Sequence, residues 1–132
     1  MDAYTAIDRK ISLNPVLQSF QLVVNKYKLD PGLIDAFLYC MEMDLTDRDY
    51  DEESYKKYIY GSAEAIGLIC LKVFCEGDEK LYESLSSLAK SLGSAFQKVN
   101  FIRGIKSDTM IGSGCISRGL ILMTLVYLAK NK

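Results

Sequence analysis

FQKVNFIRGIKSD, residues 96–108, is the most informative segment of the chain. Helical periodicity places Gln97, Asn100, Gly104 and Asp108 on one face, at positions i, i+3, i+7 and i+11. The core-facing side of a helix is normally apolar, so polar groups on that side indicate that the helix lines a cavity. The segment therefore predicts a helix whose inner face borders a site.

Outside this segment the chain also has helical periodicity, with apolar residues spaced three and four apart. Asn14-Pro15 and Asp30-Pro31 each combine a cap residue with a proline at the first helical position. Glu76-Gly77 ends one helix, and Asp78 caps the next. The predicted helices span about residues 15–28, 31–45, 52–75 and 79–107, with an acidic loop at 46–51. No segment requires a strand, so the predicted fold class is all-α.

Composition excludes several classes of function. The 132 residues carry a net charge of −1 and no block of basic residues, which disfavours nucleic-acid binding. The chain has no histidine, which excludes Cys/His zinc sites and Ser/His/Asp catalysis. The four cysteines lack paired spacing and are expected to be buried, reduced thiols.

The N-terminus has no signal-peptide pattern and the apolar run 119–129 is too short to span a bilayer, so a cytoplasmic protein is expected.

Three glycines, Gly61, Gly67 and Gly93, lie inside predicted helices, where each costs about 1 kcal/mol relative to alanine. Such positions are tolerated where helices approach closely or where a ligand needs room. Close packing explains all three, and a cavity beside Gly67 is the alternative.

Three blocks of the chain resemble the squalene/phytoene synthase family of head-to-head prenyl transferases, in particular its bacterial members. They are LIDAFLYCMEMD at 33–44, YIYGSAEAIGL at 58–68 and QKVNFIRGIKSD at 97–108. Their order and separations also fit the family, and the resemblance covers about residues 12–108.

This resemblance implies a partial helical bundle of the isoprenoid synthase fold around an apolar channel. Family members condense two prenyl diphosphates, farnesyl or geranylgeranyl, to squalene or phytoene. Magnesium ions held by two aspartate-rich motifs assist the loss of diphosphate, and carboxylate oxygens suit that metal. By position, Asn100 and Asp108 match metal ligands of the second motif, and Gln97 and Arg103 match its neighbours in the substrate site. Tyr58 matches a residue near the diphosphate, and Met41, Ala63 and Gly67 match pocket-lining residues.

The chain departs from the family pattern in its metal motifs. Gly104 stands where the second motif has an aspartate, and the loss of that carboxylate is expected to weaken magnesium binding. The first aspartate-rich motif, expected before Asn14, is absent. Asp47 and Asp51 have DxxxD spacing but fall in the acidic loop, so a solvated loop is the preferred interpretation.

After Asp108 the resemblance stops, and two interpretations of residues 109–132 stay open. If the codons from Gly114 onward are read in a shifted frame, they can encode a peptide such as RVYFPGVDFDDF. That peptide is similar to the family's continuation. The tail is then an out-of-frame read of a gene for a synthase about twice as long. The alternative is a divergent tail helix.

Two functions also stay open. The first is a squalene/phytoene synthase-like prenyl transferase that is inactive as this chain, in either the sterol or the carotenoid branch of isoprenoid biosynthesis. The second is a non-catalytic helical interaction module, either a pseudoenzyme or a subunit completed by another chain. A truncated bundle is expected to leave an exposed apolar face that promotes self-association. Two roles stay open for the apolar tail 116–128, which are to cover part of that face or to rest on a membrane surface.

Overall fold

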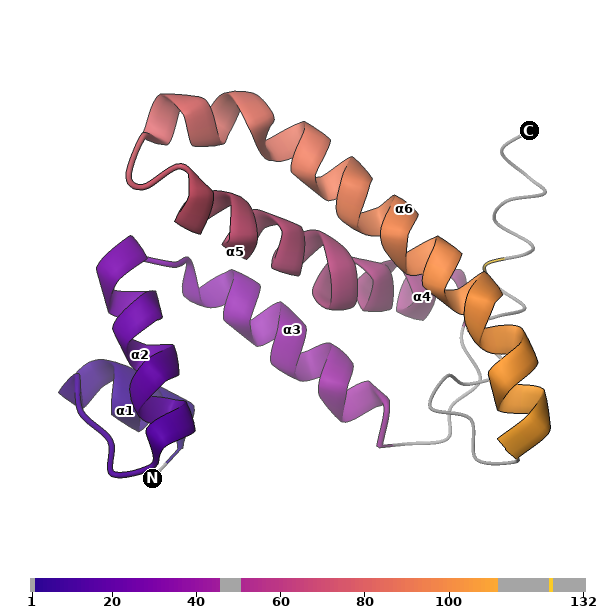
Figure 1. Cartoon of the computed structure of the whole chain (residues 1–132), viewed down its shortest axis with the longest axis horizontal. Helices are drawn as coiled ribbons and strands as arrows, with labels where there is room; N and C mark the ends of the chain where they lie inside the picture. Colours follow the sequence, from indigo (N-terminus) through magenta and orange to yellow (C-terminus); the bar gives the residue numbers. More distant parts are fainter. Residues whose placement is uncertain (1, 46–50, 112–123, 125–132) are drawn as a thin grey trace.

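The computed structural model describes residues 2–45, 51–111 and 124, with the side chains of 104–111 left out. Its elements are α1 (Ala3–Arg9), α2 (Pro15–Tyr27), α3 (Pro31–Met43), α4 (Glu52–Ile59), η1 (Tyr60–Glu64), α5 (Ala65–Phe74) and α6 (Glu79–Ile111). All the regular elements in this part of the chain are helical (Figure 1), which confirms the all-α fold class.

The predicted helix starts are confirmed by their caps. The Asn14 side chain accepts a hydrogen bond from the backbone N–H of Val16 at 2.9 Å, and Asp30 accepts one from Gly32 at 2.9 Å. Asp78 accepts one from Leu81 at 3.0 Å. Each side chain satisfies a donor that the first helical turn leaves without an intrahelical partner.

Asn14→Ala is expected to lower the free energy of unfolding by about 1 kcal/mol, because the cap of α2 is lost. Urea denaturation followed by circular dichroism measures this change. Asn14→Asp keeps an acceptor at the same place and serves as the matched control. Equal losses in the two variants would contradict the assignment of the cap.

Two features of the helices were not predicted. The short helix α1, capped by Asp2, precedes the first predicted helix. The single helix predicted over 52–75 is divided by η1, a π-helical turn in which the N–H of Ala65 reaches the carbonyl of Tyr60. π-Helical turns often mark functional positions within longer helices.

The inward face of α2 is not wholly apolar, although the spacing of apolar residues along the helix predicts an apolar stripe. Val24 is buried, but Val16 is 73% exposed, while the polar Gln21 is 1% exposed. The Oε1 atom of Gln21 accepts a hydrogen bond from Asn25 Nδ2 at 3.1 Å, so a local polar contact takes the place of an apolar one.

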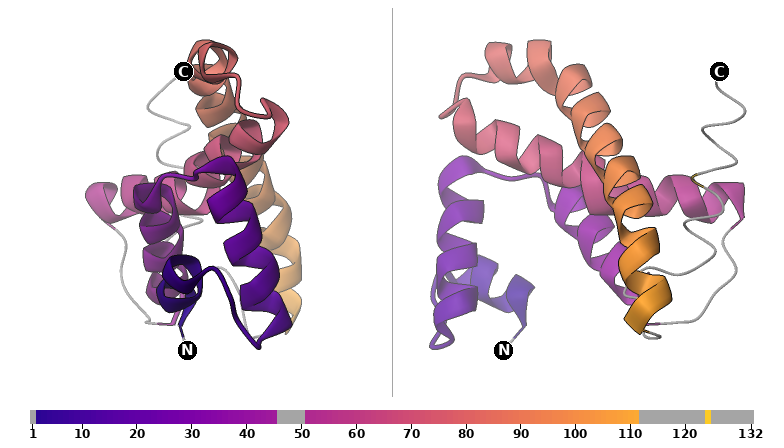
Figure 2. Two further views of the ribbon diagram at one scale, coloured as in Figure 1. Left: turned by 90° about the vertical axis from the view of Figure 1, so that its left-hand side faces the viewer. Right: turned by 45° about the vertical axis from the view of Figure 1, so that its right-hand side comes forward.

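The longer helices form layers, in which α5 lies between α3 and α6 (Figure 1). The α1–α2 hairpin packs at one end of these layers (Figure 2). There the Tyr4 hydroxyl on α1 donates a hydrogen bond to Asp35 on α3, and this bond raises the pKa of Tyr4 to about 12. The hairpin is thus joined to the layers by a polar contact as well as by apolar packing.

The turn from α5 to α6 confirms the predicted role of Glu76-Gly77. Gly77 has a φ of +96°, a left-handed conformation that favours glycine. Across this turn the Lys72 ammonium lies 2.6 Å from the Glu79 carboxylate and 4.5 Å above the Tyr82 ring. These contacts hold the adjoining ends of α5 and α6 together.

Of the tail after Ile111, the structure describes only Thr124. This residue is buried, and its hydroxyl lies 3.1 Å from the Tyr55 hydroxyl on α4. The two interpretations of the tail, and most of the acidic loop with Asp47, lie outside the described residues. No helix in the described part of the chain is long and apolar enough to cross a bilayer.

Candidate functional site

A groove of about 390 Å³ lies between the η1–α5 segment and α6. Most of the groove wall is apolar. The Gln97 amide and the Ser62 hydroxyl are polar groups within that wall. The lining residues are Ser62, Ala63, Ile66, Gly67, Cys70, Leu71, Phe74, Ala89, Leu92, Gly93, Phe96 and Gln97. A pocket of this volume and lining suits an apolar ligand with a small polar end.

Small residues bring the two walls of the groove together. A Cβ atom at Gly67 would lie 2.8 Å from the carbonyl oxygen of Ala89, and one at Gly93 would lie 2.5 Å from that of Ala63. Both distances are too short for any side chain, so close packing requires glycine at these positions. Gly67 also lines the groove, so both interpretations offered by the sequence apply to this residue.

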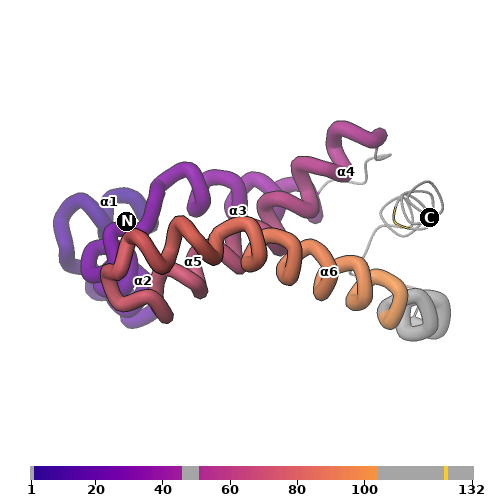
Figure 3. The backbone as a smooth tube through the Cα atoms, turned by 90° about the horizontal axis from the view of Figure 1, so that it is seen from above, coloured from indigo at the N-terminus to yellow at the C-terminus, as the bar shows by residue number. Residues whose placement is uncertain are grey.

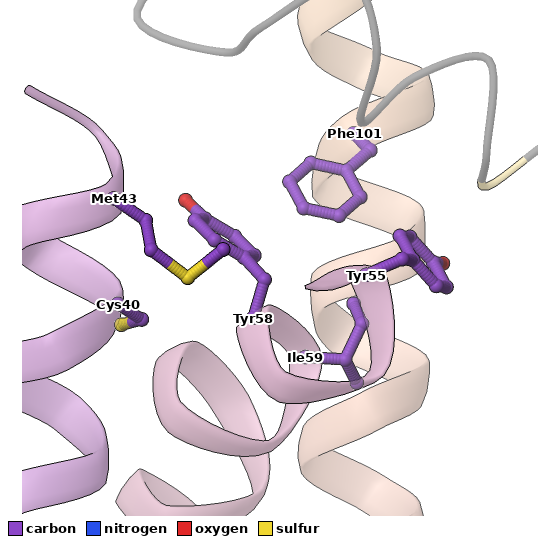
Figure 4. Close-up of a cluster of buried hydrophobic side chains, with 6 residues drawn as sticks. All are labelled: Cys40, Met43, Tyr55, Tyr58, Ile59 and Phe101. Carbon is purple, nitrogen blue, oxygen red and sulfur yellow. The ribbon is translucent and has the colours of Figure 1, made fainter. Parts of the chain in front are cut away.

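The three blocks that resemble the synthase family meet in one buried cluster beside the groove. Cys40 and Met43 come from α3, Tyr55, Tyr58 and Ile59 from α4, and Phe101 from α6 (Figure 4). The Tyr58 and Phe101 ring centroids are 6.0 Å apart. The cluster therefore fixes the three blocks relative to one another.

Polar groups in the cluster are paired. The Tyr58 hydroxyl donates a hydrogen bond to Asp44 Oδ2 at 3.2 Å, which connects the end of the first block to the second. The Cys40 thiol donates to the carbonyl of Phe37 at 3.1 Å. Burial, with a smaller contribution from the Asp44 carboxylate, raises the pKa of Cys40 to about 11. Cys40 is therefore a protonated structural thiol at neutral pH.

The cysteine expectation is wrong for Cys70. Cys40 and Cys75 are buried, but Cys70 is exposed and lines the groove. Its position on an apolar run of α5 suggested burial, but the outer side of that run faces the groove.

The polar stripe of residues 96–108 extends from the groove toward the end of α6. Gln97 is half-buried at the groove, whereas Asn100 and Arg103 are exposed. Gly104 and Asp108 belong to the helical backbone of α6, and the Asp108 side chain lies outside the described residues. Within the described side chains, the stripe thus passes from the groove wall at Gln97 to an exposed position at Asn100.

The fit of this stripe to magnesium depends on helical spacing. Asn100 and Asp108 are eight residues apart, or roughly 12 Å along the axis, and magnesium–oxygen bonds are only about 2.1 Å long. One ion therefore cannot bind both residues directly, and Gly104 supplies no oxygen ligand between them. Within the described residues no three acidic, cysteine or histidine side chains form a potential metal site. Magnesium binding by Asn100 and Asp108 therefore stays a prediction from the family resemblance, in a stripe where Gly104 contributes no side-chain oxygen.

The structure brings together only some of the residues predicted for the site. Ala63, Gly67 and Gln97 line the groove, and Tyr58 lies in the buried cluster next to it. Met41 lies on α3, 38% exposed, and does not line the groove.

Sequence reasoning missed the exposed lining residues Cys70, Phe74 and Phe96. A signal for the groove was present in two pairs of small residues spaced four apart, Ala63/Gly67 and Ala89/Gly93. Such pairs let helices approach closely and leave space beside the contact.

Comparison with known proteins places most of the chain in one family. Residues 2–120 match the model of the squalene/phytoene synthase family. This range extends at both ends beyond residues 12–108, where the resemblance was noted. No curated protein and no solved structure gives a significant match.

Proposed function

Because the chain belongs to the squalene/phytoene synthase family, we propose that it binds the chain of a prenyl diphosphate in the groove between α5 and α6 without ionising the diphosphate. The observation that carries the proposal is the groove itself. Its wall of aliphatic and aromatic side chains matches a hydrocarbon ligand, because burying apolar surface contributes roughly 25 cal/mol per Å².

The polar end of the ligand is proposed to lie near Gln97, the half-buried amide of the lining. Its side chain offers two N–H donors and a carbonyl acceptor, enough to orient a phosphate oxygen. Arg103 lies further along α6, exposed, with the planar fork of N–H donors that suits phosphate oxygens. These two residues attract and orient a diphosphate, but they do not replace the metal ions that neutralise a leaving diphosphate.

The prenyl chain is expected to carry most of the binding free energy. In calorimetric titrations, farnesyl and geranylgeranyl diphosphate should bind, whereas inorganic diphosphate alone should give no detectable heat. Phe74→Asp, at an 80% exposed residue of the groove, should weaken farnesyl diphosphate binding about tenfold, since one aromatic contact is worth about 1.5 kcal/mol.

Leu13→Asp is the control for this titration, because Leu13 is 98% exposed and does not line the groove. A second readout uses Cys70, which farnesyl diphosphate should protect from alkylation in a Cys115→Ser background. Inorganic diphosphate binding as well as farnesyl diphosphate, or an unchanged Cys70 reaction rate, would overturn the proposal.

The second candidate function is a non-catalytic helical interaction module. The observation that favours it is an exposed aliphatic face on α6, which meets the rim of the groove at Leu92. Under this function alone, neither farnesyl diphosphate nor geranylgeranyl diphosphate binds, and the titration distinguishes the two candidates.

A further inference from the structure

Helix α6 carries a regular row of aliphatic residues that is largely exposed, although Leu85 is half-buried and Leu92 also lines the groove. The residues follow a heptad pattern, alternating steps of four and three, over about three heptads. We call this row the α6 seam: Leu81, Leu85, Leu88, Leu92, Ala95, Val99 and Ile102.

The seam is exposed over most of its length. Leu88 is 65%, Leu92 60% and Val99 53% exposed. Ala89 and Gly93, which contact the other wall of the groove, lie on a different side of the helix. Figure 3, seen from above Figure 1, shows α6 lying over α5 on the viewer's side of the molecule.

We propose that the α6 seam pairs with the α6 seam of a second copy of this chain, in antiparallel orientation. An isologous contact of this kind places residue i against residue j and j against i. One register aligns the six residues of the row from Leu85 to Ile102. It pairs Leu85 with Ile102, Leu88 with Val99, and Leu92 with Ala95 of the second copy.

Charge selects the antiparallel orientation. In a parallel pair, heptad geometry brings Lys98 of one copy next to Arg103 of the other, and this like-charge contact occurs twice. In the antiparallel pair Lys98 lies opposite Ser91, and Arg103 lies opposite Tyr82. The antiparallel orientation thus removes two repulsive contacts and also opposes the two helix dipoles.

The size of the contact sets the expected affinity. The seam spans 22 residues, or roughly 32 Å of helix. A single helix pair of this length lies at the small end of specific interfaces, below about 1,200 Å² in total. The dimer is therefore expected to dissociate at concentrations on the order of 1–100 μM, within the range of sedimentation velocity.

Charge substitutions at one pair of facing residues, Leu88 and Val99, test both the contact and its register. Leu88→Glu and Val99→Lys should each leave the full-length chain monomeric at concentrations where the wild type is dimeric. Neither residue lines the groove, so both variants should bind farnesyl diphosphate as the wild type does. That readout separates failure of the dimer from failure of the proposed function, and circular dichroism checks that both variants are folded.

Mixing the two variants is the decisive step. In the antiparallel register, the carboxylate introduced by Leu88→Glu faces the ammonium introduced by Val99→Lys. At the symmetry-related position, Val99 of the first variant still meets Leu88 of the second, as in the wild type. The mixture should therefore form a heterodimer, and Leu13→Glu, an exposed control outside the seam, should leave the wild-type dimer intact. A monomeric wild type, a dimer that survives both substitutions, or a mixture that stays monomeric would overturn the proposal.

Discussion

Gly61→Ala is expected to destabilise the chain by about 3 kcal/mol, the size of effect that overpacking of a close contact produces. Gly61 lies in η1, where its backbone packs against α3. An added Cβ would overlap the carbonyl oxygen of Ala36 and lie 3.1 Å from the Cβ of Cys40. The first of these atoms belongs to the backbone of a helix, so it cannot move aside without shifting α3.

Gly32→Ala is the matched control for this substitution. A Cβ at Gly32 would meet only the Asp30 side chain, at 3.3 Å, and that side chain is exposed. The helical preference for alanine should keep the change below about 1 kcal/mol. Urea unfolding of the two variants gives the comparison, and equal stabilities would show that α3 and η1 are not packed as closely as described.

The second large effect concerns magnesium. Gly104→Asp should strengthen farnesyl diphosphate binding roughly tenfold or more in the presence of magnesium, and little in its absence. The new carboxylate stands four residues from both Asn100 and Asp108, a spacing at which helix side chains are neighbours. The wild-type chain should bind the ligand equally well with and without the metal.

Gly104→Asn is the control for charge, because it restores an oxygen ligand without a carboxylate and should give a smaller response to magnesium. Calcium in place of magnesium tests ion preference in the same titration. A wild-type affinity that already rises with magnesium would show that the stripe binds the ion despite Gly104.

The helices could be predicted from the sequence because their ends are marked by local chemistry. Asn14, Asp30 and Asp78 each cap a helix through contacts within a few residues. Helix α1 was missed because its seven residues bury only Ala6, too little for a periodic apolar pattern. The π-helical turn was missed because it arises where Gly61 and Ala63 are packed between α3 and α6, a contact that local sequence does not encode.

The candidate site could be predicted only in part. Ala63, Gly67 and Gln97 were predicted from the family resemblance, and the structure brings them to one groove. Cys70 and Phe74 were not, because exposed apolar residues have the same local pattern as buried ones. The roles of Tyr58, Met41, Asn100, Arg103 and Asp108 in ligand or metal binding remain predictions from the resemblance.

Diphosphate release from farnesyl diphosphate, measured with the wild-type chain and excess magnesium, tests the central claim most directly. Release should not exceed that of a protein-free control, and no condensed hydrocarbon product should form, although the ligand binds. Magnesium-dependent release of diphosphate above the control would contradict the account, because it would show that the chain ionises its ligand without a carboxylate at position 104.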